Sequence, residues 1–302
     1  CDLAIKEKVM EPILLGREDH IRQTIEELGL DSLKKVTIIE PRRSEHYHRY
    51  SQELFNMRQR RGVMEKEALR LMNDTSYYAA MAVHLGDAEG MISGATTKYK
   101  EAVVPILRVI GSGNRNTASG MNIVLKDEKM YFFTDTTVNI DPTAEQVANV
   151  AIHTSKVAEY FNMKPKIAML SYTNFTSHDP NPKKMRQAAD IVRKQFPDFL
   201  VDGEMQADTA VNPDIVDRIF PFCNFKDGAN ILVFPNLDSG NISYKLVQQM
   251  GECEVIGPFL MGVNKPAHVV QRTSDVDDIF NTIVLTALHY QAIPSMSKER
   301  SK

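Results

Sequence analysis

The sequence predicts an α/β fold with a mainly parallel sheet. Its 302 residues are 43% hydrophobic and 25% charged, which is an ordinary globular balance with enough apolar material for one large or two medium domains. Short β-rich runs alternate with amphipathic helical stretches almost throughout, and this alternation is typical of parallel sheets covered by helices. One hairpin pattern interrupts the alternation and indicates a second sheet.

The expected strands are short runs rich in β-branched and aromatic residues. They comprise residues 36–39, 90–93, 121–125, 130–134, 166–170, 231–234 and 255–259. The helical patterns between them include residues 144–160, 185–195, 243–249 and 276–289. Residues 121–135, MNIVLKDEKMYFFTD, form the hairpin pattern, so we place a domain boundary just before it, in the Gly-rich residues 112–120.

The last helix has the clearest pattern, with apolar residues at helical spacing from Val276 onward. Ser274 is a suitable N-cap. Asp275, Asp277 and Asp278 crowd the first turn, where carboxylates suit the helix dipole. Capping and solvation are therefore the interpretation that we favour for the first two.

Charge and cysteine usage exclude several classes of protein. The net charge of −3 argues against a broad surface for nucleic acid or anionic membrane. Cys1, Cys223 and Cys253 form no CxxC pattern and cannot all pair, which favours a reducing cytoplasm over a disulfide scaffold. No apolar run reaches the length of a membrane span. Because the chain opens on a helical pattern without an initiator Met, we expect a segment of a longer polypeptide.

Metal and nucleophile motifs are weak. His46 and His48 lie in a charged stretch that favours an exposed helix face. Asp202 and Asp208 follow an expected strand and suit helix capping as well as cation binding, so we expect no metal. GSGNRN, at residues 111–116, differs from GxGxxG and suits a surface loop, and GxSxG is absent.

Anion-binding features are more numerous. Arg58, Lys245 and Arg272 each lie at the edge of an expected element, where a cation can meet phosphate or form a surface ion pair. The small residues 239–241 lie just before the helical pattern of residues 243–249, and free amides at the N-terminus of that helix would make an anion cradle.

Several long blocks in a fixed order resemble the phosphate acetyltransferase family over nearly the whole chain. The blocks are GDAEGMISGA, PKIAMLSYT, VDGEMQADTAV, ANILVFPNLDSGNISYK and GPFLMGVNKPAHVVQR. The resemblance implies two αβα domains with mainly parallel sheets and an interdomain cleft, as in the isocitrate and isopropylmalate dehydrogenases. It implies a first domain of residues 1–116 plus 260–302, without the family's first strand, and an inserted domain of residues 117–259. Coenzyme A would bind in or near the cleft.

The resemblance also implies a site. Arg58 matches the arginine of the family's LRK motif, Lys245 the lysine of GNxxYK, Arg272 the arginine of LSRG and Asp278 the aspartate that follows. Two positions differ: the arginine of the LRP motif falls on Val104, and the serine of LSRG falls on Gln271. We therefore expect no catalytic residues here and expect acetyl-CoA to contact Arg58, Lys245, Gln271, Arg272 and Asp278.

Where the sequence differs from the family's usual motifs, it resembles the C-terminal regulatory domain of bacterial hybrid NADP-dependent malic enzymes. The segments LSYTNFTS and NKPAHVVQ carry this resemblance. The resemblance implies acetyl-CoA as an allosteric ligand that inhibits oxidative decarboxylation of malate. NADP and a divalent metal would belong only to an upstream malic enzyme domain, so that the parent chain would be an oxaloacetate-decarboxylating malate dehydrogenase. It also implies a cytoplasmic homodimer or higher homo-oligomer, with no nucleic-acid or membrane partner.

Two alternatives remain open. An active phosphate acetyltransferase would need Arg60, Arg61, Lys98, Lys100 or Arg108 to replace the missing arginine. At the level of single residues, Arg272 suits a phosphate or thioester contact and suits equally a salt bridge with Asp278. Gln271 suits a hydrogen bond to the thioester or to a pantetheine amide, or simple packing.

Overall fold

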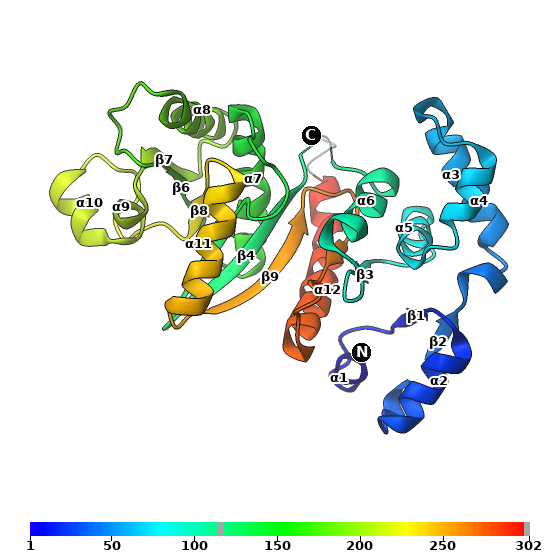
Figure 1. Ribbon diagram of the computed structural model, residues 1–302. Helices are drawn as coiled ribbons and strands as arrows, with labels where there is room; N and C mark the ends of the chain where they lie inside the picture. Colours follow the sequence, from blue (N-terminus) through cyan, green and yellow to red (C-terminus); the bar gives the residue numbers. More distant parts are fainter. Residues whose placement is uncertain (114–116, 299–302) are drawn as a thin grey trace. The chain divides into compact units, whose positions relative to one another are not determined.

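The computed structural model describes residues 1–113 and 117–298 (Figure 1). The chain forms two compact units, Cys1–Gly111 with Val263–Lys302, and Ser112–Gly262. The sequence prediction placed these boundaries a few residues away, at 116/117 and 259/260. Both units have the predicted α/β class, and most of their strand pairs are parallel. Of the Gly-rich segment GSGNRN, residues 114–116 lie outside the described residues.

The second unit contains a six-stranded sheet in the order β7-β6-β8-β5-β4-β9. Strands β5, β6, β7 and β8 pair in parallel, whereas β4 pairs antiparallel with both β5 and β9. The register of β4 and β5, from Met121 opposite Thr134 to Lys126 opposite Lys129, confirms the predicted hairpin. The strands are β4 Ser119–Lys126, β5 Lys129–Thr134, β6 Lys166–Leu170, β7 Leu200–Met205, β8 Ile231–Val233 and β9 Glu254–Met261.

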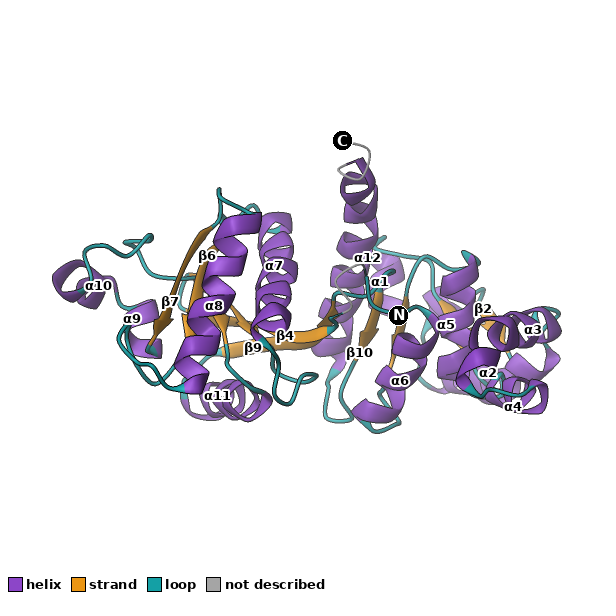
Figure 2. Ribbon diagram, turned by 90° about the horizontal axis from the view of Figure 1, so that it is seen from above, coloured by secondary structure: helices purple, strands orange, loops and turns teal. Residues whose placement is uncertain are grey.

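Helices cover both faces of this sheet (Figures 1 and 2). Alternate strand residues point to opposite faces, and on one face Phe133, Ala168 and Leu170 pack with helix residues Ala210 and Tyr244. Helices α7 and α8 lie against the other face. These helices are α7 Ala144–Tyr160, α8 Pro180–Gln195, α9 Ala207–Val211, α10 Pro213–Ile219 and α11 Leu237–Met250. The bounds of α7 agree with the sequence prediction because a capping box, Thr143 with Gln146, defines its start.

The first unit contains two short parallel strand pairs, β1 with β2 and β10 with β3. Helices α3 to α6 and α12 supply most of its buried residues, among them Tyr50, Leu54, Met81 and Ile106. Its elements are α1 Asp2–Lys6, β1 Ile13–Leu15, α2 Glu18–Glu27, β2 Thr37–Ile39, α3 Tyr47–Arg58, α4 Glu65–Leu71, α5 Thr75–Leu85, β3 Met91–Ser93, α6 Tyr99–Val109, β10 Ala267–Val269 and α12 Val276–Lys298.

The carboxyl ends of β3 and β10 lie side by side. The amide of Val270 donates to the carbonyl of Ser93 at 2.9 Å. Gly94 has φ of +111°, and a Cβ there would lie 2.3 Å from the Val270 carbonyl oxygen, so only glycine allows this close approach. The loop after β3 is thereby held beside the turn from β10 to α12.

Helix α12 begins at Val276, as predicted, but its N-cap is Asp275 and not the predicted Ser274. The amide of Asp278 donates to Asp275 Oδ1 at 2.8 Å, and the amide of Asp275 donates to Asp278 Oδ2 at 3.2 Å. Asp275 therefore caps the helix, because the two aspartates satisfy each other's backbone donors. The hydroxyl of Ser274, the predicted cap, instead accepts from the amide of Gln271 at 3.1 Å.

No helix in the described part of the chain is long and apolar enough to cross a membrane.

Candidate anion-binding site

The turn from β10 to α12 carries Gln271, which is half-buried, and Arg272, which is exposed. The guanidinium of Arg272 donates from Nη2 to the carbonyl oxygen of Thr96 at 3.1 Å. This bond ties the turn to the loop after β3, at the carboxyl ends of two parallel strands, where α/β proteins commonly bind ligands. The carboxylate of Asp278 accepts the Asp275 amide and so acts in helix capping. Two of the expected site residues, Gln271 and Arg272, thus share one exposed turn.

Arg58 lies at the C-terminal end of α3, in a cavity of about 360 Å³. Its Nε is buried, and no hydrogen-bond partner for it occurs among the described residues. Burial lowers the pKa of Arg58, and the charges of Arg61 and Arg108 lower it further. A buried donor without a partner is unfavourable, and so is a group of like charges. An anion held here would offset both costs.

Arg108 lines the same cavity and comes from α6. Its Nη1 donates to the hydroxyl of Tyr77, a buried residue of α5, at 3.0 Å. Val104 lies one helical turn earlier on α6 and is half-buried, but it is not among the described residues that line the cavity. The cavity is lined by Leu54, Arg58, Arg61, Gly62, Val63, Glu67, Leu71, Tyr77 and Arg108.

Sequence reasoning found Arg58 on its own but did not bring it together with Arg108. The sequence did contain a signal for Arg108. It lies four residues after Val104, and residues four apart share a helix face. The sequence analysis named Arg108 and Arg61 only among five candidates to replace the family arginine that is absent at Val104. Of the five, these two line the cavity of Arg58.

Lys245 belongs to the other unit, where it lies exposed on α11. Its ammonium group lies 5.0 Å from the centroid of the Tyr244 ring, within the range of a cation–π contact. The structure therefore gives Lys245 a partner within its own unit.

The predicted anion cradle at residues 239–241 is wrong. Helix α11 begins earlier, at Leu237, and Asn236 caps it by accepting the amide of Ser239 at 2.9 Å. The amide of Gly240 donates to the Asn236 carbonyl at 3.2 Å. Because these amides already have partners inside the protein, they are not free to hold an anion.

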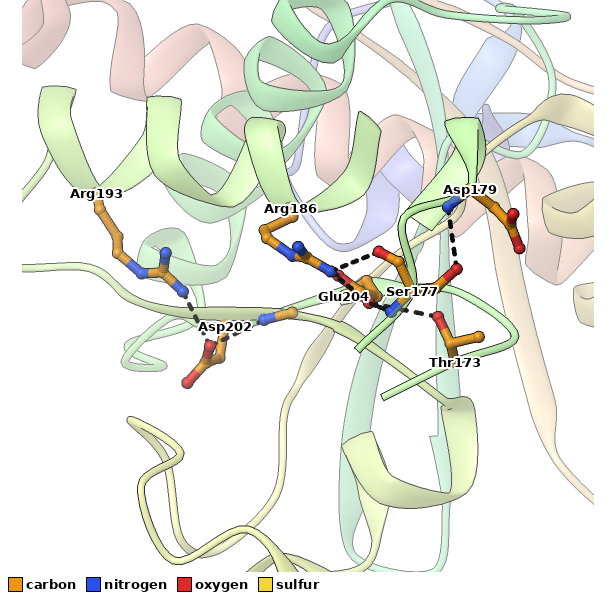
Figure 3. A network of polar contacts seen from close by, with 8 residues as sticks. Thr173, Ser177, Asp179, Arg186, Arg193, Asp202 and Glu204 are labelled. Carbon is orange, nitrogen blue, oxygen red and sulfur yellow. Dashed lines mark hydrogen bonds and ion pairs between the residues drawn. The ribbon is translucent and has the colours of Figure 1, made fainter. Parts of the chain in front are cut away.

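The two aspartates weighed as cation ligands have other roles. Asp202 lies inside β7 rather than after a strand, and its Oδ1 accepts from Arg193 of α8 at 2.9 Å (Figure 3). Asp208 lies exposed in α9 and accepts from the amide of Thr209. Among residues 1–113 and 117–298, no group of three His, Cys, Asp or Glu side chains could hold a metal ion.

Glu204 is a buried charged residue that the sequence analysis missed. It is fully buried in β7, and Arg186 of α8 donates to its two oxygens from Nε at 2.8 Å and from Nη2 at 2.9 Å. The amide of Ser177 also donates to Glu204 at 3.2 Å. Figure 3 shows Arg186 and Arg193 reaching from the same helix to Glu204 and Asp202. These bonds fasten α8 and the loop after β6 to the sheet, so the network is structural.

The fold is that of an α/β protein with an exposed turn at the carboxyl ends of two parallel strands. Comparison with known proteins identifies its family. A sequence model of the phosphate acetyl/butaryl transferase family matches residues 2–287. The chain belongs to this family.

Particular relatives and structures agree with this assignment. The chain is 35% identical to a phosphate acetyltransferase of Nitratidesulfovibrio vulgaris, over 97% of this chain and 42% of that protein. It is also 35% identical to an NADP-dependent malic enzyme of Escherichia coli, over 94% of this chain and 38% of that protein. The chain thus spans about two fifths of each. A phosphotransacetylase structure from Streptococcus pyogenes superposes with a TM-score of 0.90 at 33% identity, covering 97% of this chain and 89% of that one.

Proposed function

We propose that this chain is a catalytically degenerate phosphate acetyltransferase domain that binds acetyl-CoA and regulates an attached malic enzyme domain. Binding of acetyl-CoA would inhibit oxidative decarboxylation of malate by that upstream domain. In this proposal NADP and a divalent metal belong to the upstream domain, and the assembled protein is a homo-oligomer.

The observation that carries the proposal is the composition of the β10–α12 turn. Arg272 keeps a position from which it bonds the loop after β3, while Gln271 stands where the family's LSRG motif has serine. Glutamine has an amide in place of a hydroxyl, so it can hydrogen-bond a carbonyl or an amide but offers no hydroxyl for proton transfer. The turn therefore suits binding better than catalysis.

The likeness to a malic enzyme supports the proposed partner. The E. coli relative is covered over about two fifths of its length, which leaves the remainder of that protein for other domains. A ligand changes the activity of an attached domain only if it binds two conformations with unequal affinity. The proposal therefore requires that acetyl-CoA affinity differ between the active and inhibited arrangements of the parent protein.

A second candidate function is active acyl transfer, and the position of Arg108 favours it. In that reaction a phosphate oxygen attacks the thioester carbonyl carbon, the carbon–sulfur bond breaks, and the thiolate leaves and takes up a proton. Arg108 places a guanidinium on the helix that has lost one at Val104. Acyl transfer, however, needs groups aligned on the transition state, and a misplaced group loses about a hundredfold in rate or more.

Two measurements separate the candidates. Isothermal titration calorimetry of this chain with acetyl-CoA tests binding, and a thiol-specific dye with acetyl-CoA and inorganic phosphate tests acyl transfer. The proposal predicts binding without phosphate-dependent release of thiol. Sustained release of thiol that requires phosphate supports active transfer instead, and absence of binding contradicts both.

A further inference from the structure

Helix α11 of the second unit carries a row of large apolar side chains on its outer face. Ile242, Leu246 and Met250 are spaced four residues apart, so they lie along one side of the helix. These three residues are 57%, 52% and 79% exposed. The other side of α11 is buried through Gly240 and Tyr244, and Tyr244 packs in the core beside the sheet. The exposed row therefore takes no part in the core of this unit.

We propose that this row is half of an interface with a second copy of the chain, in which two α11 helices pack antiparallel about a two-fold axis. Contiguous exposed apolar side chains mark an interaction surface, whereas single exposed ones do not. A two-fold interface uses the same patch on both copies, so the patch must be complementary to itself. The inference specifies the homo-oligomer of the proposed function and rests on that part of it alone.

The charges of α11 are complementary in one antiparallel register. Asp238 and Lys245 are both exposed and lie seven residues apart, on the same side of the helix as Ile242. When the two-fold axis passes midway between these charged residues, Asp238 of each copy faces Lys245 of the other. The dimer then contains two reciprocal ion pairs beside the apolar row. A parallel arrangement would instead place like charges together, which is unfavourable.

The same register places apolar groups opposite one another. Ile242 lies nearest the axis and meets its own copy, while Leu246 reaches the start of the other helix at Leu237. Ile140 extends the patch there, because the Leu237 amide donates to its carbonyl at 3.1 Å and Ile140 is 77% exposed. Met250 lies one turn beyond Leu246 and comes over Ile140. Each member of the row thus gains an apolar partner when two copies meet.

Leu246→Glu tests the interface, with Ile219→Glu as a matched control. Ile219 is equally exposed, at 52%, and belongs to the same unit, but it lies on α10. Light scattering after size-exclusion chromatography measures the mass, and sedimentation at several concentrations measures the dimer dissociation constant. We expect a dimer for wild type and for Ile219→Glu. Leu246→Glu should weaken association about a hundredfold or more, because the dimer would bury two unpaired carboxylates.

Two results overturn the proposal at this stage. One is a wild-type chain that stays monomeric at every concentration, which would leave the row to a different partner. The other is an unchanged dimer in Leu246→Glu, which would place the contact between copies on another surface. Ile242→Ser guards against a folding defect, since it removes apolar surface without adding charge. It should keep the circular dichroism spectrum of wild type and still weaken association about tenfold.

Exchanging the charges tests the register. Asp238→Lys and Lys245→Asp should each weaken association by about tenfold, because each places like charges opposite one another. The double variant restores both pairs with reversed signs, so it should associate within about threefold of wild type. Damage confined to the helix would accumulate in the double variant, whereas rescue requires contact between the copies. Absence of rescue contradicts the antiparallel register and the proposal with it.

Calorimetry with acetyl-CoA on the same samples separates this inference from the proposed function. A chain that dimerises through Leu246 but binds no acetyl-CoA supports the interface and contradicts the regulatory function. A monomeric chain that binds acetyl-CoA contradicts the interface and leaves ligand binding in place.

Discussion

The ring of His268 packs against the ring of His289, with 5.6 Å between their centroids, inside the first unit. His268 lies in β10, three residues before Gln271, and His289 lies in α12, so the two rings join the elements on either side of the candidate turn. Burial lowers the pKa of His268 to about 3 and that of His289 to about 4. Both rings are therefore neutral at pH 7.

This pair predicts loss of stability in acid. In the unfolded chain each histidine takes up a proton below about pH 6.5, whereas the folded protein resists protonation down to about pH 4. The unfolding free energy should thus fall between pH 6.5 and 4, by about 1.4 kcal/mol per pH unit for each histidine. Urea unfolding at a series of pH values measures this slope. His289→Phe should reduce it and His20→Asn, at an exposed position of α2, should not. Equal slopes in all three proteins would show that the histidine pair is not responsible.

Arg186→Met should destabilise the second unit by about 3 kcal/mol, because it leaves the fully buried Glu204 without its charged partner. Arg17→Met is the control, since Arg17 and Asp19 form an exposed ion pair whose loss should leave stability nearly unchanged. Denaturant unfolding of both variants measures the difference. Similar values for the two would mean that the Glu204 network adds nothing to stability.

Gly94→Ala should disrupt the contact between the ends of β3 and β10. A Cβ at this position would meet the Val270 carbonyl oxygen at 2.3 Å. Gly86→Ala is a matched control, since Gly86 also has positive φ, of +88°, but has open space around it. We expect about 1 kcal/mol of destabilisation at Gly86 and at least twice that at Gly94, with loss of acetyl-CoA binding only at Gly94. Unchanged binding in Gly94→Ala would separate the ligand site from this turn.

Restoring the family residues tests whether the site is degenerate. The double variant Val104→Arg with Gln271→Ser supplies the guanidinium and the hydroxyl that the family motifs contain. Because such groups act together, each single variant should stay inactive while the double variant shows phosphate-dependent thiol release. Activity in the parent chain equal to that of the double variant would mean that these two positions do not limit catalysis.

The sequence predicted elements whose signals are local. The bounds of α7 follow from the capping box at Thr143, and the hairpin follows from two alternating runs around a polar turn. Strand β7 was not among the predicted strand ranges, because the charged residues Asp202 and Glu204 interrupt its apolar run. Their charges are paired by Arg193 and Arg186 of α8, which the local sequence does not reveal. Strands β1 and β10, of three residues each, were not among the predicted strands.

The candidate site was predictable only in part, for the same reason. Arg272 and Gln271 are adjacent in sequence, and the motif around them marks one turn. The cavity joins Arg58 with Arg108, which belong to different helices, so their proximity depends on how α3, α5 and α6 pack. The cradle predicted at residues 239–241 failed because the helix begins at Leu237, well before the predicted start at residue 243, and Asn236 takes the amide that an anion would need.

The central claim is that this domain binds acetyl-CoA without transferring its acetyl group to phosphate. One experiment tests it most directly: calorimetric titration of the chain with acetyl-CoA, followed by assay of the same sample for free thiol after addition of inorganic phosphate. The account predicts saturable binding and no release of thiol above the rate without phosphate. Phosphate-dependent release that continues over many turnovers, or no binding at saturating acetyl-CoA, would contradict it.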